Sequence, residues 1–235
     1  MLTGGIIGLT GCVTDKNSTF HFTATQANET LLLKVKNYAG LIKLKRAELK
    51  KSDNAKTRYS LANYYYLSQD YRSSLYYLKP LLVTGAAPDV YLLQAKNLAS
   101  LGKYKEALSF VNIVLAKERT NGAAMNLKGV LQAQMGDIDQ ALHSFNMARN
   151  NYQQEEDVVN NIAMIYILKK RYNEAVQLLL PIYLRGYHDP QLDHNLTVAL
   201  AKSGDLRYAI EIIKKGNYSK HPDLLAADLF NIQAY

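Results

Sequence analysis

The chain has 235 residues, of which 48% are hydrophobic and 20% are charged, a composition typical of a folded protein rather than a disordered one. It contains only five prolines and thirteen glycines, which favours long helices, and its single cysteine, Cys12, excludes an intrachain disulfide. The net charge of +8 suits a membrane surface, an acidic partner or nucleic acid, and it equally suits a generally basic surface.

The start of the chain carries a candidate lipid-attachment signal. Residues 2–10 are apolar or small and lead into Leu9-Thr10-Gly11-Cys12, which resembles the bacterial lipobox, in which a signal peptidase cuts before the cysteine and the thiol is diacylglycerylated. The apolar segment is short and has no basic residue, unlike a secretory signal, so we expect the true start to lie upstream of Met1. We interpret residues 1–11 as a signal-peptide remnant and Cys12 as a lipid acceptor. The alternative is an ordinary apolar stretch with a stray cysteine.

Residues 12–26 are rich in Thr, Ser, Asn and Asp without a helical period, which predicts a flexible lipidated tether. Over 27–54, apolar residues recur at three- and four-residue steps and predict an N-terminal basic amphipathic helix. Its charged face either attracts anionic headgroups or is simply solvated. Its cations, against only Glu29 and Glu48, are Lys34, Lys36, Lys43, Lys45, Arg46, Lys50 and Lys51.

From residue 55 onward the sequence repeats itself. Ala107, Ala141, Ala175 and Ala209 recur with a constant period of about 34 residues, which is the signature of tetratricopeptide (TPR) helix–turn–helix units. Ser74 occupies the matching place one repeat before Ala107. The predicted repeats cover 55–223, as 55–87, 88–121, 122–155, 156–189 and 190–223, and a C-terminal capping helix is expected over 224–235.

Small residues inside each predicted repeat let its two helices cross closely. The second helices provide Ser74 and the four alanines above, and glycines supply turns between the helices where a positive φ is needed. Proline near the first turn marks three helix starts. The predicted fold is therefore all-α: a right-handed α-solenoid of about five TPR repeats with flanking N- and C-terminal helices. The small residues of the first helices are Ala62, Ala95, Gly129, Ala163 and Thr197; the turn glycines are Gly102, Gly136 and Gly204; the prolines are Pro88, Pro190 and Pro222.

The sequence contains none of the common catalytic or cofactor motifs: no G-x-S-x-G elbow, no phosphate-binding glycine loop and no H-E-x-x-H pair. His188 and His194 flank Asp189 and Asp193, but Asp189 is better explained as a helix N-cap. We therefore expect a binding scaffold rather than an enzyme, with no metal, cofactor or small-molecule substrate.

The first helices of a TPR stack line its concave groove, so their outward positions are the candidate protein-binding residues. Asparagines there can hold a peptide backbone, and Tyr, Met, Val and Ile can receive apolar side chains; the alternative is plain exposed surface. The predicted groove residues are Tyr59, Asn63, Tyr66, Leu92, Lys96, Asn126, Val130, Asn160, Met164, Ile167, His194, Val198 and Lys202.

Three stretches together resemble TadD, the TPR lipoprotein family of tight-adherence (Tad/Flp) pilus systems. They are Leu9-Thr10-Gly11-Cys12, residues 160–163 followed by 170–175, and residues 193–200 followed by Gly204-Asp205. The resemblance implies a pilotin-like scaffold that binds the pilus secretin, or another pilus-assembly protein, and aids its localisation or assembly. It also implies lipid anchoring at the periplasmic face of the bacterial outer membrane. Val13 follows the cysteine in place of the aspartate associated with inner-membrane retention, which favours sorting to the outer membrane. A lipoprotein in that place would not meet nucleic acid, so nucleic acid is not an expected partner.

Three alternatives remain open. A type IV pilus pilotin would share the plan and differ in its partner. A lipoprotein of the β-barrel assembly machine also has five TPRs, although its repeats depart further from a regular period. A soluble cytoplasmic TPR adaptor would require Cys12 to be fortuitous.

Overall fold

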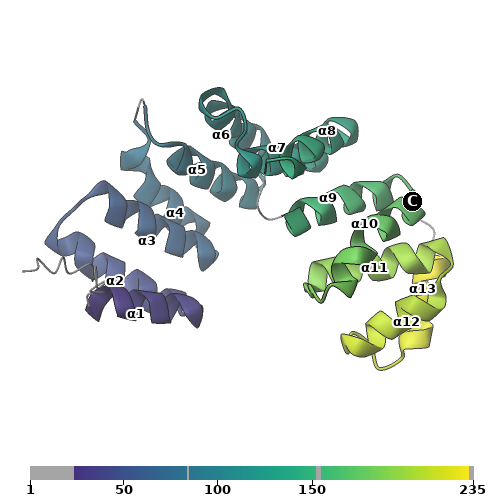
Figure 1. Ribbon diagram of the computed structural model, residues 1–235. Helices are drawn as coiled ribbons and strands as arrows, with labels where there is room; N and C mark the ends of the chain where they lie inside the picture. Colours follow the sequence, from purple (N-terminus) through teal and green to yellow (C-terminus); the bar gives the residue numbers. More distant parts are fainter. Residues whose placement is uncertain (1–23, 84, 152–154, 233–235) are drawn as a thin grey trace, which may run out of the picture.

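The computed structural model describes residues 24–83, 85–151 and 155–232, and Figure 1 shows its helices following one another in an arch. Cys12, the predicted signal remnant and nearly all of the predicted tether lie outside the described residues. The elements are α1 (Ala24–Lys34), α2 (Tyr38–Lys51), α3 (Ala55–Leu67), α4 (Tyr71–Leu78), the 3-10 turn η1 (Lys79–Leu81), α5 (Pro88–Ser100), α6 (Tyr104–Lys117), α7 (Gly122–Gln134), α8 (Ile138–Arg149), α9 (Glu155–Leu168), α10 (Tyr172–Leu184), α11 (Pro190–Ser203), α12 (Leu206–Lys215) and α13 (Pro222–Asn231).

The predicted α-solenoid is confirmed. The five predicted repeats correspond to the antiparallel pairs α3/α4, α5/α6, α7/α8, α9/α10 and α11/α12, and each pair packs on the next. Prolines open α5, α11 and α13 as expected, and Asp189 caps α11 by accepting hydrogen bonds from the backbone N–H groups of Gln191 and Leu192. Within the described residues, none of the helices has the length and hydropathy needed to cross a bilayer.

The small residues lie where the helices of each pair cross. Ala62, Ala95 and Ala163 of the first helices are fully buried. The small residues at the matching place in the second helices of the later repeats are also fully buried: Ala107, Ala141, Ala175 and Ala209. In the first pair the answering residue is Ser74, whose hydroxyl accepts a 2.8 Å hydrogen bond from the Nδ2 group of the buried Asn97 on α5. This bond gives the serine a polar partner in the core, where an unpaired hydroxyl would be costly.

In the third pair, α7 and α8, the crossing point has a glycine packed against a large aromatic side chain. Gly129 takes the place of alanine on α7, and the ring of Phe145 from α8 fills the space that a methyl group would need. A Cβ at Gly129 would lie 2.6 Å from two ring carbons of Phe145, which is 2% exposed. A glycine in mid-helix is normally unfavourable, so this one is explained by the large aromatic residue opposite it.

The turn inside each repeat requires a residue with positive φ. Gly102, Gly136 and Gly204 supply it as predicted, with φ of 74°, 86° and 92°. The first and fourth repeats have Gln69 and Lys170 at the same place, with φ of 64° and 58°. These two residues adopt the left-handed conformation at a cost that glycine would not bear.

The N-terminal segment differs from the prediction. The expected single helix over 27–54 is two helices, α1 and α2, because Lys36 adopts a φ of 53° and Asn37 then caps α2 by accepting a 2.9 Å bond from the Gly40 N–H. The turn at Lys36 lies one repeat length before the turn at Gln69, so the helix pair is a divergent copy of the repeat. Leu41, fully buried, takes the place of the usual small residue.

An ion cluster around the buried Lys45 links α1 to α2 and α3. The Lys45 ammonium donates to Glu29 at 2.7 Å and to Glu48 at 2.9 Å, and the Tyr64 hydroxyl of α3 donates to Glu29 at 2.6 Å. Burial opposes the charge on Lys45, but the hydrogen bonds outweigh it, so the pKa of Lys45 is raised and that of Glu29 is lowered. Burial and the bond to Glu29 together raise the pKa of Tyr64.

The C-terminal capping helix is α13, which begins at Pro222 and lies across α11 and α12. The Lys202 ammonium of α11 donates to the backbone carbonyls of Phe230 and Ile232, at the end of α13. A lysine near the last carbonyls of a helix satisfies groups that the helix cannot pair internally.

Candidate protein-binding groove

The first helices of the repeats form the inner side of the arch. Contacts join α3 to α5, α5 to α7, α7 to α9 and α9 to α11, whereas within the described residues no comparable contacts join the second helices of neighbouring repeats. Because the first helices approach one another more closely, the stack bends toward them, and the arch of Figure 1 is the result. The predicted groove residues all lie on these five helices.

Toward the N-terminal repeats the groove contains a cleft of about 280 Å³ between α3, α5 and α7. We call it the lysine cleft. Three predicted groove residues meet in it, one from each of these helices, and the start of α6 closes one side with Tyr104. The lining residues are Tyr66, Lys96, Ala99, Ser100, Tyr104, Leu127, Val130, Leu131 and Gln134.

Among the described residues, Lys96 is the only cation that lines the lysine cleft. Burial lowers the pKa of this lysine, and Asp89 acts in the opposite direction without cancelling the effect. Within the part of the chain that the structure describes, its ammonium forms no ion pair. An unpaired ammonium beside tyrosines and aliphatic groups favours a partner that brings a carboxylate together with apolar surface.

Further along the groove a second cleft, of about 250 Å³, opens between α7, α9 and the start of α11. We call it the amide cleft. The Asn161 side chain donates a 2.9 Å bond to the Asn126 amide oxygen, and Asn195 donates a bond of the same length to Asn160. These pairs link three successive repeats by amide groups that can also meet a peptide backbone. The lining residues are Asn126, Glu156, Asp157, Asn160, Asn161, Tyr187, Asp189, Gln191 and Leu192.

Three carboxylates make the amide cleft acidic. Burial raises the pKa of Asp157, and the nearby charges of Asp189 and Glu156 raise it further. None of the three forms an ion pair with another described residue. These three negative charges lie close together, and none of the described residues that line the cleft is a cation. A lysine or arginine side chain of a partner would therefore relieve the repulsion between the carboxylates.

The other predicted residues fall into distinct surroundings. Tyr59, Asn63, Ile167 and Val198 are half-buried, and Met164 is exposed. Leu92, in contrast, is only 8% exposed and belongs to the core between the first repeats.

In the last repeat the helix α13 and the segment before it engage two of the predicted residues. Lys202 donates to the terminal carbonyls of α13, and the exposed His194 packs edge-on against Tyr218, which precedes α13, with ring centroids 4.6 Å apart. The Tyr218 hydroxyl also donates a 2.8 Å bond to the buried Asp193, and burial together with this bond raises the pKa of Tyr218 to about 12. The two clefts therefore lie in the groove before this covered end.

Sequence reasoning missed the carboxylates of the amide cleft. Glu156 and Asp157 sit at the start of α9, and Asp189 was predicted only as a cap for α11. The available signal was the acidic run 155–157 at a predicted helix start, one repeat length before the start of α11. Over the described residues, no group of three or more His, Cys, Asp or Glu side chains is arranged to hold a metal ion.

No protein-family model matches the chain, and no curated protein matches it either. Among solved structures, it is similar to TTC0263, a thermophilic TPR protein of Thermus thermophilus, with a TM-score of 0.65 and 17% identity over 75% of this chain and 97% of that one. It is also similar to BtubC from P. vanneervenii, with a TM-score of 0.58 and 14% identity over 91% and 96%, and to the Cut9–Hcn1 assembly of APC/C, with a TM-score of 0.61 and 17% identity over 81% and 36%. At these identities the likeness establishes the fold, a solenoid of TPR repeats.

Proposed function

We propose that this chain is a lipid-anchored, pilotin-like scaffold that binds a segment of a pilus secretin in its groove and aids the localisation or assembly of that secretin in the outer membrane. The observation that carries the binding role is the pair of clefts on the inner side of the solenoid. They combine half-buried amides, one ammonium without an ion pair and three carboxylates without a cationic partner among the described residues. This arrangement suits a polypeptide partner rather than a small reactant.

The chemistry of the two clefts describes the segment that would bind. Its backbone would meet the asparagine ladder of α7, α9 and α11, as amide groups pair with peptide groups. A basic side chain would enter the amide cleft beside Asp157, and a carboxylate with an apolar neighbour would enter the lysine cleft beside Lys96. Opposite charges at two separated points also fix the direction in which the segment lies.

The membrane role rests on the resemblance of residues 9–12 to a lipobox and of the repeats to the TadD family. Acyl chains on Cys12 would anchor the protein stably, since two or more chains bind a bilayer far better than one. Tethering would raise the effective concentration of the groove near its membrane partner.

A Cys12→Ser variant tests this function. We expect the unlipidated protein to retain secretin binding in detergent extracts. It should leave the membrane fraction when the membranes are washed at about 1 M salt, which screens attraction between basic residues and anionic lipids, and secretin multimers in the outer membrane should decline. A soluble TPR adaptor predicts no change in fractionation and no palmitate labelling of the wild type. Unchanged secretin multimers in the Cys12→Ser strain would refute the pilotin role.

A further inference from the structure

The helix pair α1/α2, with its connecting turn, concentrates positive charge at one end of the molecule. It contains seven Lys and Arg residues against two glutamates, a net charge of +5, whereas the whole chain carries +8. Both glutamates are occupied by the buried Lys45, as described above. The six remaining cations are exposed and form no ion pair with any described residue; they are Lys34, Lys36, Lys43, Arg46, Lys50 and Lys51.

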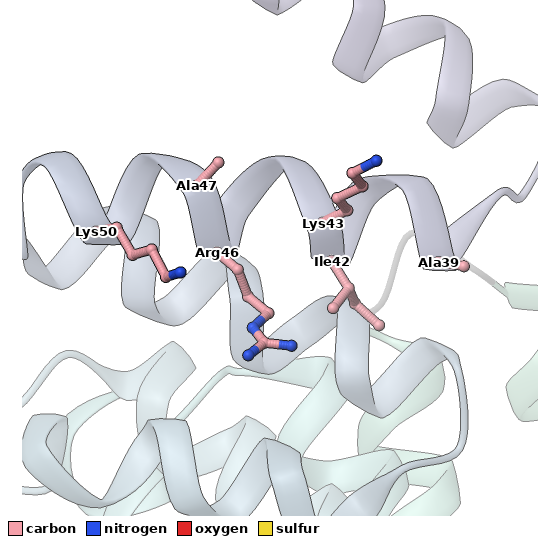
Figure 2. Close-up of a pocket in the computed structure, with 6 residues that line it drawn as sticks. All are labelled: Ala39, Ile42, Lys43, Arg46, Ala47 and Lys50. Carbon is pink, nitrogen blue, oxygen red and sulfur yellow. The ribbon is translucent and has the colours of Figure 1, made fainter.

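Three of these cations border an open hollow of about 600 Å³ on the surface of α2. Figure 2 shows its six lining residues in a row along this one helix, with alanines and an isoleucine between the charged side chains. We call this surface the α2 basic face. Its residues are Ala39, Ile42, Lys43, Arg46, Ala47 and Lys50.

The neighbouring helix α1 has the same combination of apolar and basic groups. Leu31 and Val35, one turn apart, are 60% and 63% exposed, and Lys34 lies between them in the sequence. Exposed aliphatic residues among lysines are typical of surfaces that rest in the headgroup region of a bilayer, where the apolar groups are buried and the ammonium groups meet phosphates.

We propose that the α2 basic face binds the anionic phospholipid headgroups of a membrane surface. None of the described residues that line it bears a side-chain amide, hydroxyl or carboxylate, so it lacks the groups with which the amide cleft can pair with a polypeptide backbone. The polar side-chain groups that line it are the ammonium groups of two lysines and the guanidinium of Arg46, all of which attract phosphates. Each Lys or Arg held near an anionic surface strengthens attachment about five-fold.

The chain length before α1 agrees with this placement. Eleven residues separate Cys12 from Ala24, and at full extension they reach about 40 Å. If Cys12 carries lipid, as the proposed function holds, the α2 basic face stays near the bilayer, and its contact would set the orientation of the groove. The face itself needs neither the lipid nor the groove, so its binding can be tested separately from the proposed function.

The test measures how the full chain with Cys12→Ser co-sediments with vesicles of phosphatidylcholine alone and of phosphatidylcholine with about one-third phosphatidylglycerol. We expect binding to the anionic vesicles only, and its loss as salt rises from about 0.1 M to about 1 M, where the screening length falls from about 10 Å to about 3 Å. The variant Lys43→Gln/Arg46→Gln/Lys50→Gln should weaken binding about a hundred-fold.

The matched control is Lys105→Gln/Arg119→Gln/Lys220→Gln, which removes the same charge from exposed positions outside α1 and α2. It should change binding by less than about three-fold. Any contribution of the apolar residues 1–11 is common to all these proteins. Equal binding to both vesicle types, or equal loss in both triple variants, would overturn the proposal. A wild-type dimer that the α2 triple variant dissociates, without vesicle binding, would assign the face to a second copy instead.

Discussion

The close packing of the Phe145 ring against Gly129 predicts an unusual response to a glycine-to-alanine substitution. Gly129→Ala in the middle of α7 should normally stabilise the helix by about 1 kcal/mol. Here the new Cβ would lie 2.6 Å from the Phe145 ring, about 1 Å closer than ordinary carbon contacts allow. The ring is 2% exposed and has little space to move, so the strain should approach the upper part of the range of about 1–3 kcal/mol for overpacking. We expect a net loss of about 1–2 kcal/mol.

A double-mutant cycle measured by urea unfolding, followed by far-UV circular dichroism, tests this reasoning. Phe145→Leu alone should cost about 1–2 kcal/mol because it leaves a cavity. In the Gly129→Ala background the smaller residue relieves the clash, so the double variant should be more stable than the sum of the single changes by about 1–2 kcal/mol. The control Ala163→Gly, at the same place in the fourth repeat, should cost about 1 kcal/mol. Stabilisation by Gly129→Ala, or additive effects, would refute the account.

Three further changes test other parts of the structure. Gln69→Gly should stabilise the first repeat by about 0.5–1 kcal/mol because it removes a strained positive φ, whereas the control Gly102→Ala should destabilise the second repeat. The measurement is the midpoint of urea unfolding, which should rise for the first variant and fall for the second. Tyr218→Phe should cost about 1–3 kcal/mol at neutral pH, because it leaves the buried Asp193 carboxylate without the hydroxyl that donates to it. Since the pKa of Tyr218 is raised to about 12, the stability advantage of the wild type should be fully present below about pH 10 and should vanish as the pH rises toward 12. A stability difference that stays constant with pH would contradict this. Lys45→Met should loosen α1, at a cost of about 1–3 kcal/mol because the two glutamates that lose their cation are partly exposed, and it should increase proteolysis of α1. The exposed Lys43→Met should change neither.

Most of the fold was predictable because repeat proteins reuse one packing solution. The regularly spaced alanines are buried at the helix crossings, and the prolines open the helices that they were expected to open. The break between α1 and α2 was not predictable from periodicity, since Lys36 adopts a conformation that is usually given to glycine, and Leu41 hides the repeat by replacing the small residue. Tertiary contacts around Lys45 and Tyr64 stabilise this divergent copy.

The groove was predictable only in outline. Counting helix positions places the candidate residues on the inner helices, but it does not tell which of them meet across repeats. Tyr66, Lys96 and Val130 share a cleft, whereas Lys202 is used to cap α13. The carboxylates of the amide cleft come from helix starts and a connecting loop, positions that a rule about helix faces omits. Their convergence depends on how the repeats stack.

Affinity capture of the full-length protein from its native membranes, followed by mass spectrometry, tests the central claim most directly. Wild type should be compared with Lys96→Glu/Asp157→Lys, which reverses the charge in each cleft, and with the single variant Lys105→Glu as a control. The account predicts a secretin subunit with wild type and with the control, and its loss with the double variant, while all three proteins remain in the membrane fraction. Recovery of barrel-assembly components or of no envelope protein, or equal recovery of the secretin with the double variant, would contradict it.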